Sequence, residues 1–325
     1  MNQQIRDHGG DIDLGMARYG GLPDQWIDLS TGINRMPYRV PSLPIEAWTS
    51  LPTKAAQARL LQVAGAAYRT DAPMLAVAGA QAAIQMIPQL GRPGCARVLS
   101  PTYNEHAASL AAAGWTAEEV GSLDALEGAD LAVVVNPNNP DGRIHSPDEI
   151  MGLAGKVGRL VVDESFVDPV PRFSVAPMAG KAGLLVLRSF GKFYGLAGIR
   201  LGFVVGAAGD IANLAEMAGP WPVAGPAIAV GTMALADHEW ARMTALRLGT
   251  EAQRIDALTT RAGWRLVGGC ALFRLYGTPD AIAAQDKLAR FRIWSRIFPH
   301  SAHWLRLGLP GSPAEWERLA GALNC

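Results

Sequence analysis

The sequence predicts an α/β protein: a large domain built on a doubly wound, mostly parallel sheet, followed by a smaller α+β domain. Three observations support this prediction. Short apolar runs alternate with helix-compatible segments, which is typical of strand–helix–strand units. Hydrophobic residues make up 49% of the 325 residues and charged residues only 18%, so the chain can bury a large core. Beyond about Pro222 the alternation ends and a different pattern begins.

In the first part of the chain, the apolar runs are the expected strands and the segments between them the expected helices. Ser146 and Glu149 form a capping box at the start of one of these helices. Consecutive parallel strands need a crossover connection, and the predicted helices supply it. The expected strands are Met74–Val77, Arg97–Ser100, Leu131–Val135, Leu160–Val162, Leu184–Leu187 and Leu201–Val205, and the expected helices are Gln81–Leu90, Glu105–Ala113 and Pro147–Lys156.

The C-terminal part is expected to begin with one long helical stretch, Ala227–Ala262. Alternating residues then predict antiparallel strands at Trp264–Val267 and Ala271–Tyr276, followed by a helix at Pro279–Arg290 and a strand at Trp304–Leu307. The first ~45 residues are rich in Gly and Pro and are expected to form an arm on this smaller domain. The expected domains are therefore 1–45 (arm), 46–222 (large) and 223–325 (small).

Composition excludes several classes of function. The 29 Lys and Arg residues balance 29 Asp and Glu residues, so no basic excess offers contacts to nucleic acid. Prolines interrupt the two uncharged stretches, Ala72–Gly91 and Met217–Ala236, and the N-terminus has no apolar signal region, so we expect no membrane segment. The cysteines, Cys95, Cys270 and Cys325, are widely spaced, which argues against disulfides and favours a cytoplasmic location.

Polar residues follow five of the expected strands, where an open α/β sheet binds its ligands. A turn at Gly79 leads through Ala80 and Gln81 into a helix, whose first N–H groups can bind a phosphate. The hydroxyl of Ser189 and the guanidinium of Arg200 would complete such a phosphate site.

Three further side chains suit an aromatic, electron-withdrawing cofactor. Tyr103 can supply a flat face for a ring, and Asp163 can keep a pyridine nitrogen protonated. Lys192 can form an imine if its amine stays partly unprotonated. A phosphate site, a carboxylate and an amine in this order are the groups that a pyridoxal 5'-phosphate (PLP) enzyme needs.

The motifs resemble those of fold-type I PLP-dependent enzymes over nearly the whole chain. Ser189–Phe203 (SFGKFYGLAGIRLGF) is similar to the cofactor-lysine motif S-x-x-K…G-x-R-x-G. NPNNPDG, at residues 136–142, is similar to N-P-N-N-P-T-G, and DESF, at 163–166, to D-E-A-Y/F. The spacing also fits, with 24 residues from Asn139 to Asp163 and 29 from Asp163 to Lys192. The resemblance implies a fold-type I PLP-dependent transferase fold.

The resemblance also implies a role for each matching position. Lys192 corresponds to the Schiff-base lysine, Asp163 to the partner of the pyridinium and Tyr103 to the stacking aromatic ring. Asn139 corresponds to the residue that hydrogen-bonds the cofactor's phenolate oxygen, and Arg306 to the arginine that binds the substrate carboxylate. The remaining cofactor residues, those of the phosphate site, are Gly79, Ala80, Gln81, Ser189 and Arg200.

Three positions depart from the family pattern. Phe166 replaces a Tyr of many relatives and so lacks its hydroxyl. Leu51 replaces a Tyr that reaches the neighbouring subunit's phosphate, which weakens the case for that contact but not for a homodimer. Asp141 replaces the usual Thr, with little expected effect on the chemistry.

The N-terminal region points to one reaction. His8-Gly9-Gly10-Asp11, the segment Trp26–Asn34 and the hinge Gly219–Pro226 resemble threonine-phosphate decarboxylases of cobalamin biosynthesis. The resemblance implies PLP-dependent decarboxylation of L-threonine O-3-phosphate to (R)-1-amino-2-propanol O-2-phosphate. The expected substrate-binding residues are His8, Gly32, Asn139 and Arg306, with His8 a candidate for the phosphate.

Alternatives remain open at this point. The PLP motifs alone do not separate decarboxylation from transamination, so an aminotransferase of the histidinol-phosphate type is the nearest rival. A PLP-sensing regulator would need a basic DNA-binding segment, and a nicotinamide dehydrogenase would need a GxGxxG motif after its first strand; neither is visible. His300 and His303 have no carboxylate companion, and we expect no metal.

Overall fold

The computed structural model describes residues 8–324, which divide into two compact units. One unit contains Tyr38–Asn139 and Arg143–Thr244; we call it the sheet unit. The other contains the described residues up to Pro37, Pro140–Gly142 and the described residues from Ala245; we call it the terminal unit. The domain limits expected from the sequence, at 45/46 and 222/223, stay a prediction beside these structural units.

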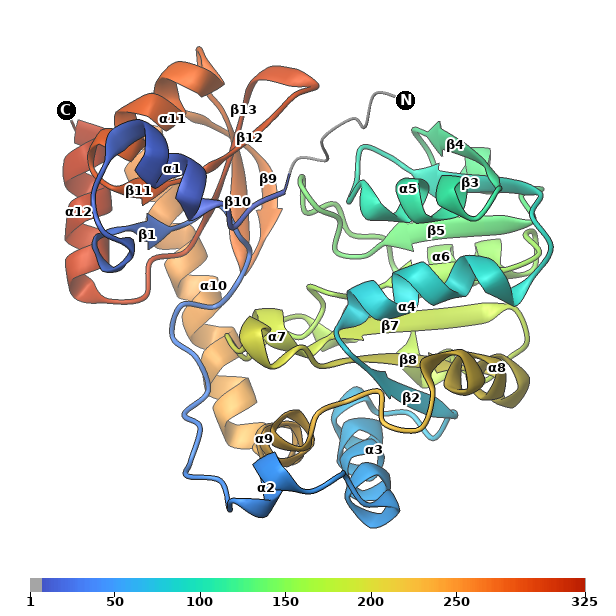
Figure 1. Ribbon diagram of the computed structural model, residues 1–325. Coiled ribbons are helices and arrows are strands. Elements are labelled where there is room, and N and C mark those ends of the chain that lie inside the picture. The colour runs from blue at the N-terminus through green and yellow to red at the C-terminus, as the bar shows by residue number, and fades with distance from the viewer. Residues whose placement is uncertain (1–7, 325) are drawn as a thin grey trace. The chain divides into compact units, whose positions relative to one another are not determined.

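A seven-stranded sheet forms the centre of the sheet unit (Figure 1). All neighbouring pairs are parallel except those of β8, which runs antiparallel to β2 and to β7. The sheet is therefore mixed but mostly parallel, and this confirms the expected fold class. The strands, in spatial order, are β2 (Met74–Val77), β8 (Gly202–Gly206), β7 (Leu184–Ser189), β6 (Leu160–Asp163), β5 (Leu131–Val135), β3 (Cys95–Leu99) and β4 (Thr116–Val120).

The central strands are apolar because helices cover the sheet. β5 is buried at every position, and Val98, Val133 and Leu185 share one core cluster with Ile84 of α4. Near-continuous Val and Leu runs are typical of parallel strands buried on both faces. The helices of this unit are α2 (Glu46–Thr49), α3 (Lys54–Tyr68), α4 (Ala80–Met86), α5 (Glu105–Ala112), α6 (Pro147–Ala154), α7 (Phe190–Phe193), α8 (Ala208–Ala218) and α9 (Gly225–Ala236).

The terminal unit contains a four-stranded antiparallel sheet in the order β12-β13-β10-β9 and a two-stranded parallel sheet, β1-β11. β1 comes from the N-terminal segment and pairs Ile27 with Ile293 of β11. Trp26 and Trp294 meet edge-to-face beside the first helix, α1. The elements are α1 (Ile12–Tyr19), β1 (Ile27–Asp28), β9 (Arg265–Cys270), β10 (Phe273–Gly277), α11 (Ala281–Arg290), β11 (Ile293–Trp294), β12 (Arg296–Phe298), β13 (Ser301–Gly308) and α12 (Pro313–Asn324).

One expectation about secondary structure was wrong, and elements such as α1 and β4 were not predicted. The stretch expected as one helix is two, α9 and α10 (His238–Arg261), because Asp237 ends the first and its side chain accepts from Trp240 N at 3.0 Å to cap the second. The sequence predicts an N-terminal arm without naming an element in it, and the structure shows the helix α1 there, capped by Asp11. The edge strand β4 was not expected, because its charged residues Glu118 and Glu119 hide the strand pattern.

Within residues 8–324, no helix combines the length and the apolar character that a membrane span requires.

Candidate active site

Asp163 and Lys192 come from neighbouring parallel strands of the sheet unit. Asp163 is the last residue of β6 and pairs in register with Leu187 of β7. Lys192 lies in α7, the helical turn that begins directly after β7. Parallel strands present their carboxyl ends at one edge of the sheet, so the structure places both functional groups at this edge.

Asp163 is held as an ionised carboxylate. Its side chain is buried, with His106 Nε2 2.9 Å from Oδ2 and Ser165 N donating to Oδ1 at 2.9 Å. Burial alone raises the pKa of this carboxyl, but the hydrogen bond and charge of His106, with the charge of Lys192, lower the pKa to about 2. A buried, ionised carboxylate of this kind can keep a pyridine nitrogen protonated.

The Lys192 amine faces a mixed polar and aromatic surface. Its Nζ donates to Ser189 Oγ at 3.4 Å and lies 4.9 Å from the centroid of the Phe166 ring. Its charge acts on Asp163 and also on the half-buried Asp168. Amine and carboxylate therefore lie within electrostatic range of each other in one unit, which the predicted imine chemistry requires.

The residues expected to bind a phosphate are close together at the start of α4. Gly79 has φ +77°, and a Cβ there would lie 2.7 Å from Arg200 Nη2, so only glycine leaves room for this guanidinium. A Cβ on Gly202 would lie 2.5 Å from Ala80 N, so β8 also passes close to the first turn of α4. Gly79, and Gly202 at the end of the G-x-R-x-G motif, thus let Arg200 and β8 approach the first N–H groups of α4, those of Ala80 and Gln81.

Tyr103 is linked to this phosphate site through Gln81. The Tyr103 hydroxyl donates to Gln81 Oε1 at 3.2 Å, and Gln81 Nε2 donates to Glu105 Oε2 at 3.0 Å. The Tyr103 ring also meets His106 edge-on, with centroids 6.2 Å apart. The ring is therefore fixed beside the partner of Asp163.

The asparagines around Asn139 hold its loop in place. Asn136 is fully buried and exchanges hydrogen bonds with the backbone of His145, at 3.0 and 2.9 Å. Asn138 donates to Pro101 O at 2.9 Å and accepts from Thr102 Oγ1 at 2.6 Å. These two residues stabilise the loop, and Asn139, half-buried beside them, stays the predicted cofactor contact.

In the terminal unit, Ser30 connects the predicted substrate residues. Gly10 N donates to Ser30 Oγ at 2.8 Å, and a Cβ on Gly9 would lie 2.5 Å from Ser30 O. The same carbonyl accepts from Arg306 Nη2 at 2.6 Å. Ser30, which precedes Gly32, therefore contacts both the Gly-Gly pair that follows the exposed His8 and Arg306. Arg306 is 6% exposed.

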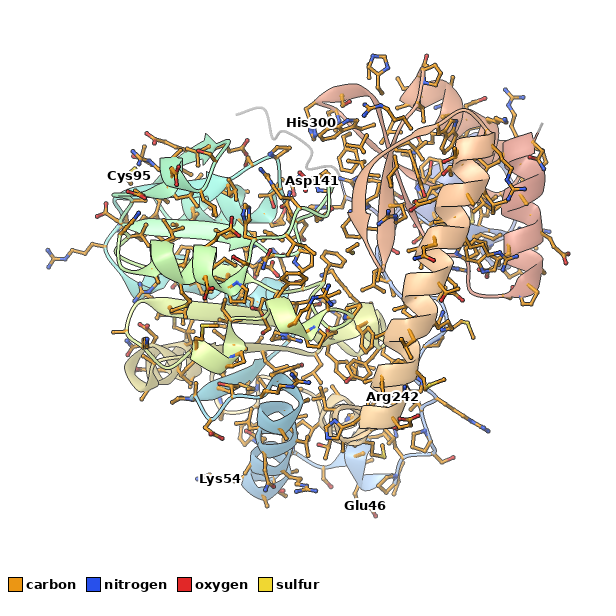
Figure 2. All side chains as sticks on the ribbon, turned by 180° about the vertical axis from the view of Figure 1, so that it is seen from behind. Glu46, Lys54, Cys95, Asp141, Arg242 and His300 are labelled. Atoms are coloured by element: carbon orange, nitrogen blue, oxygen red, sulfur yellow. The ribbon has the colours of Figure 1, made fainter. Side chains whose placement is uncertain are left out.

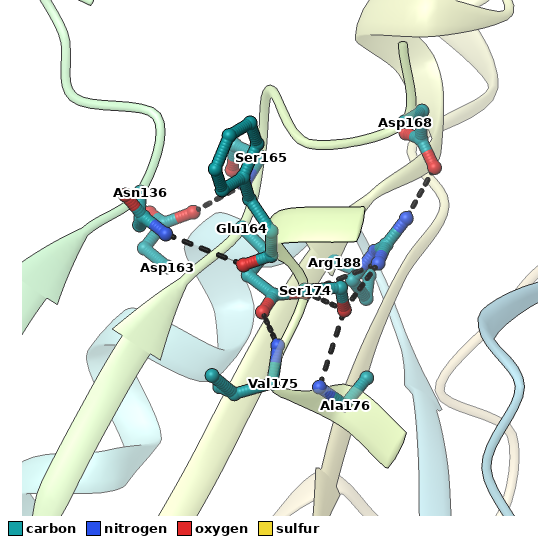
Figure 3. A network of polar contacts seen from close by, with 10 residues as sticks. Asn136, Asp163, Glu164, Ser165, Asp168, Ser174, Val175, Ala176 and Arg188 are labelled. Atoms are coloured by element: carbon teal, nitrogen blue, oxygen red, sulfur yellow. Dashed lines mark hydrogen bonds and ion pairs between the residues drawn. The ribbon is translucent and has the colours of Figure 1, made fainter. Parts of the chain in front are cut away.

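Sequence reasoning missed several polar residues of these sites. His106 follows Tyr103 by three residues, a helical spacing that could have placed it near the same ligand. Arg296 is the register partner of Arg306 on β12 and β13, a pairing that only the fold creates. Arg188, the only charged residue in the run Leu184–Arg188, binds Glu164 and Asp168 in a buried network (Figure 3). Within residues 8–324, no cluster of three His, Cys, Asp or Glu side chains suits a metal ion.

A mostly parallel α/β sheet with a buried aspartate, a lysine and a predicted phosphate site at its strand ends is the arrangement of a PLP-dependent transferase. The family model described as aminotransferase class I and II matches residues 49–323, and the chain belongs to this family.

One relative of known name and two solved structures show which proteins of this kind the chain is similar to. Threonine-phosphate decarboxylase from Pseudomonas aeruginosa is 43% identical over 324 residues, covering 98% of this chain and 97% of that protein. The solved structure of histidinol-phosphate aminotransferase from Sinorhizobium meliloti in complex with pyridoxal-5'-phosphate has a TM-score of 0.81 and 20% identity, with 99% of this chain and 95% of that chain covered. L-threonine-O-3-phosphate decarboxylase from Porphyromonas gingivalis has a TM-score of 0.76 and 20% identity, with 91% and 98% covered. The two structures share the fold of this chain.

Proposed function

We propose that this protein is a PLP-dependent carboxy-lyase that converts L-threonine O-3-phosphate to (R)-1-amino-2-propanol O-2-phosphate and CO2. The observation that carries the proposal is the 43% identity to a threonine-phosphate decarboxylase over nearly the whole of both chains. The reaction would place the protein in cobalamin biosynthesis.

The residues at the strand ends fit PLP. The space that Gly79 leaves beside Arg200, with the first N–H groups of α4, suits the phosphate of the cofactor. Asp163 suits the ring nitrogen, because its carboxylate stays ionised when buried. Tyr103 suits the face of the ring and Asn139 its phenolate oxygen. Bound PLP supplies an electron-accepting ring that takes up the electron pair left on Cα when CO2 departs.

The chain's own residues would then orient the substrate and move protons. Lys192 would supply the amine that holds the cofactor, and the same amine could return a proton to Cα of the substrate. Ser189, 3.4 Å from this amine, can orient it by accepting a hydrogen bond. Asp163 keeps its negative charge throughout and stabilises the proton on the ring nitrogen.

Two arginines of the terminal unit match the two acidic groups of the substrate. Arg306 and Arg296 are register partners on β13 and β12, so their side chains leave the same face of the sheet. We propose that Arg306 binds the carboxylate by a bidentate contact, with the Gly32 amide as a second candidate. We propose that Arg296, with His8, binds the phosphate.

The alternative is a PLP-dependent aminotransferase that acts on a phosphorylated substrate. The S. meliloti enzyme shares the fold at 20% identity, which supports the architecture but not its reaction. The N-terminal His-Gly-Gly segment, which contacts Ser30 beside Arg306, favours the decarboxylase.

Rapid mixing of the PLP-loaded protein with L-threonine O-3-phosphate tests the proposal. We expect CO2 release without a keto acid and a product mass equal to that of aminopropanol phosphate. If CO2 were absent and turnover required 2-oxoglutarate, the protein would be an aminotransferase.

We further propose that the protein is a homodimer. Ile45, Trp48, Leu51 and Trp221 are 65, 65, 64 and 52% exposed, a concentration of large apolar side chains that suits a subunit interface. A Cβ on Gly225 would lie 2.2 Å from Ala47 O, so the segment after Trp221 reaches α2, which carries Trp48. Figure 2 shows Glu46, at the start of α2, and Lys54, at the start of α3, at the same end of the sheet unit.

Light scattering of the protein and of a W48E variant tests the dimer. We expect twice the chain mass for the first and a shift towards the single-chain mass for the second. We also propose a cytoplasmic location, because Cys95 and Cys270 are free thiols. Fractionation of the native cells tests it.

A further inference from the structure

A buried ion triad lies directly beside the lysine segment. The guanidinium of Arg188 donates from Nη1 to Glu164 Oε2 at 3.1 Å and from Nη2 to Asp168 Oδ1 (Figure 3). Arg188 is 3% exposed, and its guanidinium carbon lies 4.1 Å from the centroid of the Tyr68 ring. Burial of three charges costs several kcal/mol per ion unless their geometry compensates for it, so a triad here calls for a reason beyond stability.

The two carboxylates mark the ends of one short segment. Residues 164–168 form a loop after β6, and this loop contains Phe166, whose ring lies beside the Lys192 amine. Glu164 is fixed further by Ser174 Oγ and Val175 N, each at 2.5 Å. By binding both ends of the loop, Arg188 fixes the position of Phe166.

Arg188 also belongs to the segment that carries the lysine. It is adjacent to Ser189, whose Oγ accepts from Lys192 Nζ at 3.4 Å. The Arg188 guanidinium therefore connects the Phe166 loop, which lies beside the Lys192 amine, to the end of β7, which leads to Lys192. A shift of Arg188 would move both surfaces that Lys192 contacts.

The triad carries one net negative charge, since two carboxylates surround one guanidinium. Burial raises the pKa of Asp168, and the charges of Arg188 and Lys192 oppose this rise by favouring the ionised carboxylate. Asp163, at the end of β6, is the other carboxylate on which the charge of Lys192 acts. Tyr194, the residue after α7, and Tyr68 of α3 face Asp168 and Arg188.

We propose that Arg188 is a positioning residue for Lys192: by holding Glu164 and Asp168 together, it fixes the Phe166 loop and keeps the Asp168 carboxylate where it controls protonation of the amine. The inference rests on the proposed function only in taking Lys192 as the cofactor-binding lysine. It concerns the Lys192 amine in the protein without PLP, so it can be tested by a measurement that does not depend on turnover.

Two isosteric variants separate this role from general stability. D168N and E164Q each remove one negative charge from the triad and keep the shape of the side chain. The measurement is the pH dependence of acetylation of Lys192 by acetic anhydride, followed by peptide mass spectrometry on the full-length chain prepared without PLP. Exposed Lys54 and Lys181 in the same samples serve as references.

D168N removes a negative charge that favours the protonated amine, so the unprotonated fraction of Lys192 at a fixed lower pH is expected to rise about tenfold. E164Q is expected to change that fraction less than about twofold, because Asp168 still faces the amine. Equal profiles for D168N and the parent protein, or equal shifts for both variants, would overturn the proposal.

R188K tests the mechanical half of the proposal. Lysine keeps the positive charge but cannot bind two carboxylates through a planar fork. We expect amide hydrogen exchange of Ser165–Val167 to be at least about tenfold faster, with β5 unchanged as the internal control. Unchanged protection of the loop would overturn this half. CO2 release by the PLP-loaded parent protein distinguishes a failure of this inference from a failure of the proposed function. If the parent protein releases CO2 but the acetylation profile of Lys192 is the same in D168N, only this inference is refuted. If the acetylation profile shifts but no CO2 is released, only the proposed function is refuted.

Discussion

The hydrogen bond between His106 and Asp163 predicts a measurable coupling between two buried residues. Nε2 of His106 lies 2.9 Å from Asp163 Oδ2, and both side chains are about 3% exposed. Although burial raises the pKa of Asp163, His106 and Lys192 together bring it from 3.8 to about 2. At ~1.4 kcal/mol per pKa unit, this depression corresponds to about 2 kcal/mol of folding free energy.

The direction of the pH dependence follows from the lowered pKa. A carboxyl group with a depressed folded-state pKa stabilises the folded state at pH values above its unfolded pKa, here about 4. That contribution is lost as the pH falls from about 4 to about 2. At pH 7 it is therefore fully present, and this is the pH at which to measure it.

The perturbation is a double-mutant cycle of H106F and D163N. The phenyl ring fills the space of the imidazole but leaves the buried carboxylate without its charged hydrogen bond, which costs about 1.5–3 kcal/mol. In the D163N background the same change removes only a contact to a neutral amide. We expect H106F to be less costly there, with a coupling free energy of about 1–2 kcal/mol.

The assay is urea unfolding of the four proteins, prepared without PLP, at pH 7. The matched control is H238F, which replaces an exposed histidine at the start of α10 and should combine with D163N additively to within about 0.5 kcal/mol. A His106–Asp163 coupling no larger than this control value would refute the assignment of the depressed pKa to His106.

Three further predictions follow from the site. K192R keeps the positive charge but should abolish borohydride fixation of PLP, seen by mass spectrometry, and lower CO2 release at least about 10²-fold; retained fixation would exclude Lys192 as the imine-forming residue. R296M should lower kcat/KM for L-threonine O-3-phosphate about 10–100-fold and leave kcat/KM for L-threonine, which has no phosphate, nearly unchanged. R306M should lower kcat/KM for both substrates, because both have the carboxylate. Equal effects of R296M on the two substrates would contradict a contact between Arg296 and the phosphate. G79A places a Cβ 2.7 Å from Arg200 Nη2 at φ +77°, and urea unfolding should show a loss of about 1–2 kcal/mol; unchanged stability would contradict the need for glycine there.

Local sequence signals were sufficient for much of the fold. The apolar runs Met74–Val77 and Leu131–Val135 are strands with the expected bounds, and the capping box of Ser146 and Glu149 begins α6 as expected. These signals are local, because apolar periodicity and side-chain caps depend on residues a few positions apart. Elements with mixed signals, such as α10 and the charged edge strand β4, required their tertiary neighbours to be recognised.

The family could be recognised from sequence because its chemistry depends on short motifs whose order is preserved along the chain. The matches at Asn139, Asp163 and Lys192 led to the family that the comparison confirms. Their roles as contacts of cofactor and substrate stay predictions, which the experiments above test.

The fold class and the family could be predicted from the amino-acid sequence and are confirmed, whereas the roles of the site residues stay predictions. The residues from distant parts of the chain that surround the site became apparent only in the folded structure. His106 of α5 contacts Asp163 at the end of β6, Arg188 binds both ends of the Phe166 loop, and Arg296 of β12 is the register partner of Arg306 on β13. Strand register, burial and charge pairing depend on contacts between segments far apart in the chain, and no local pattern encodes which of these segments meet.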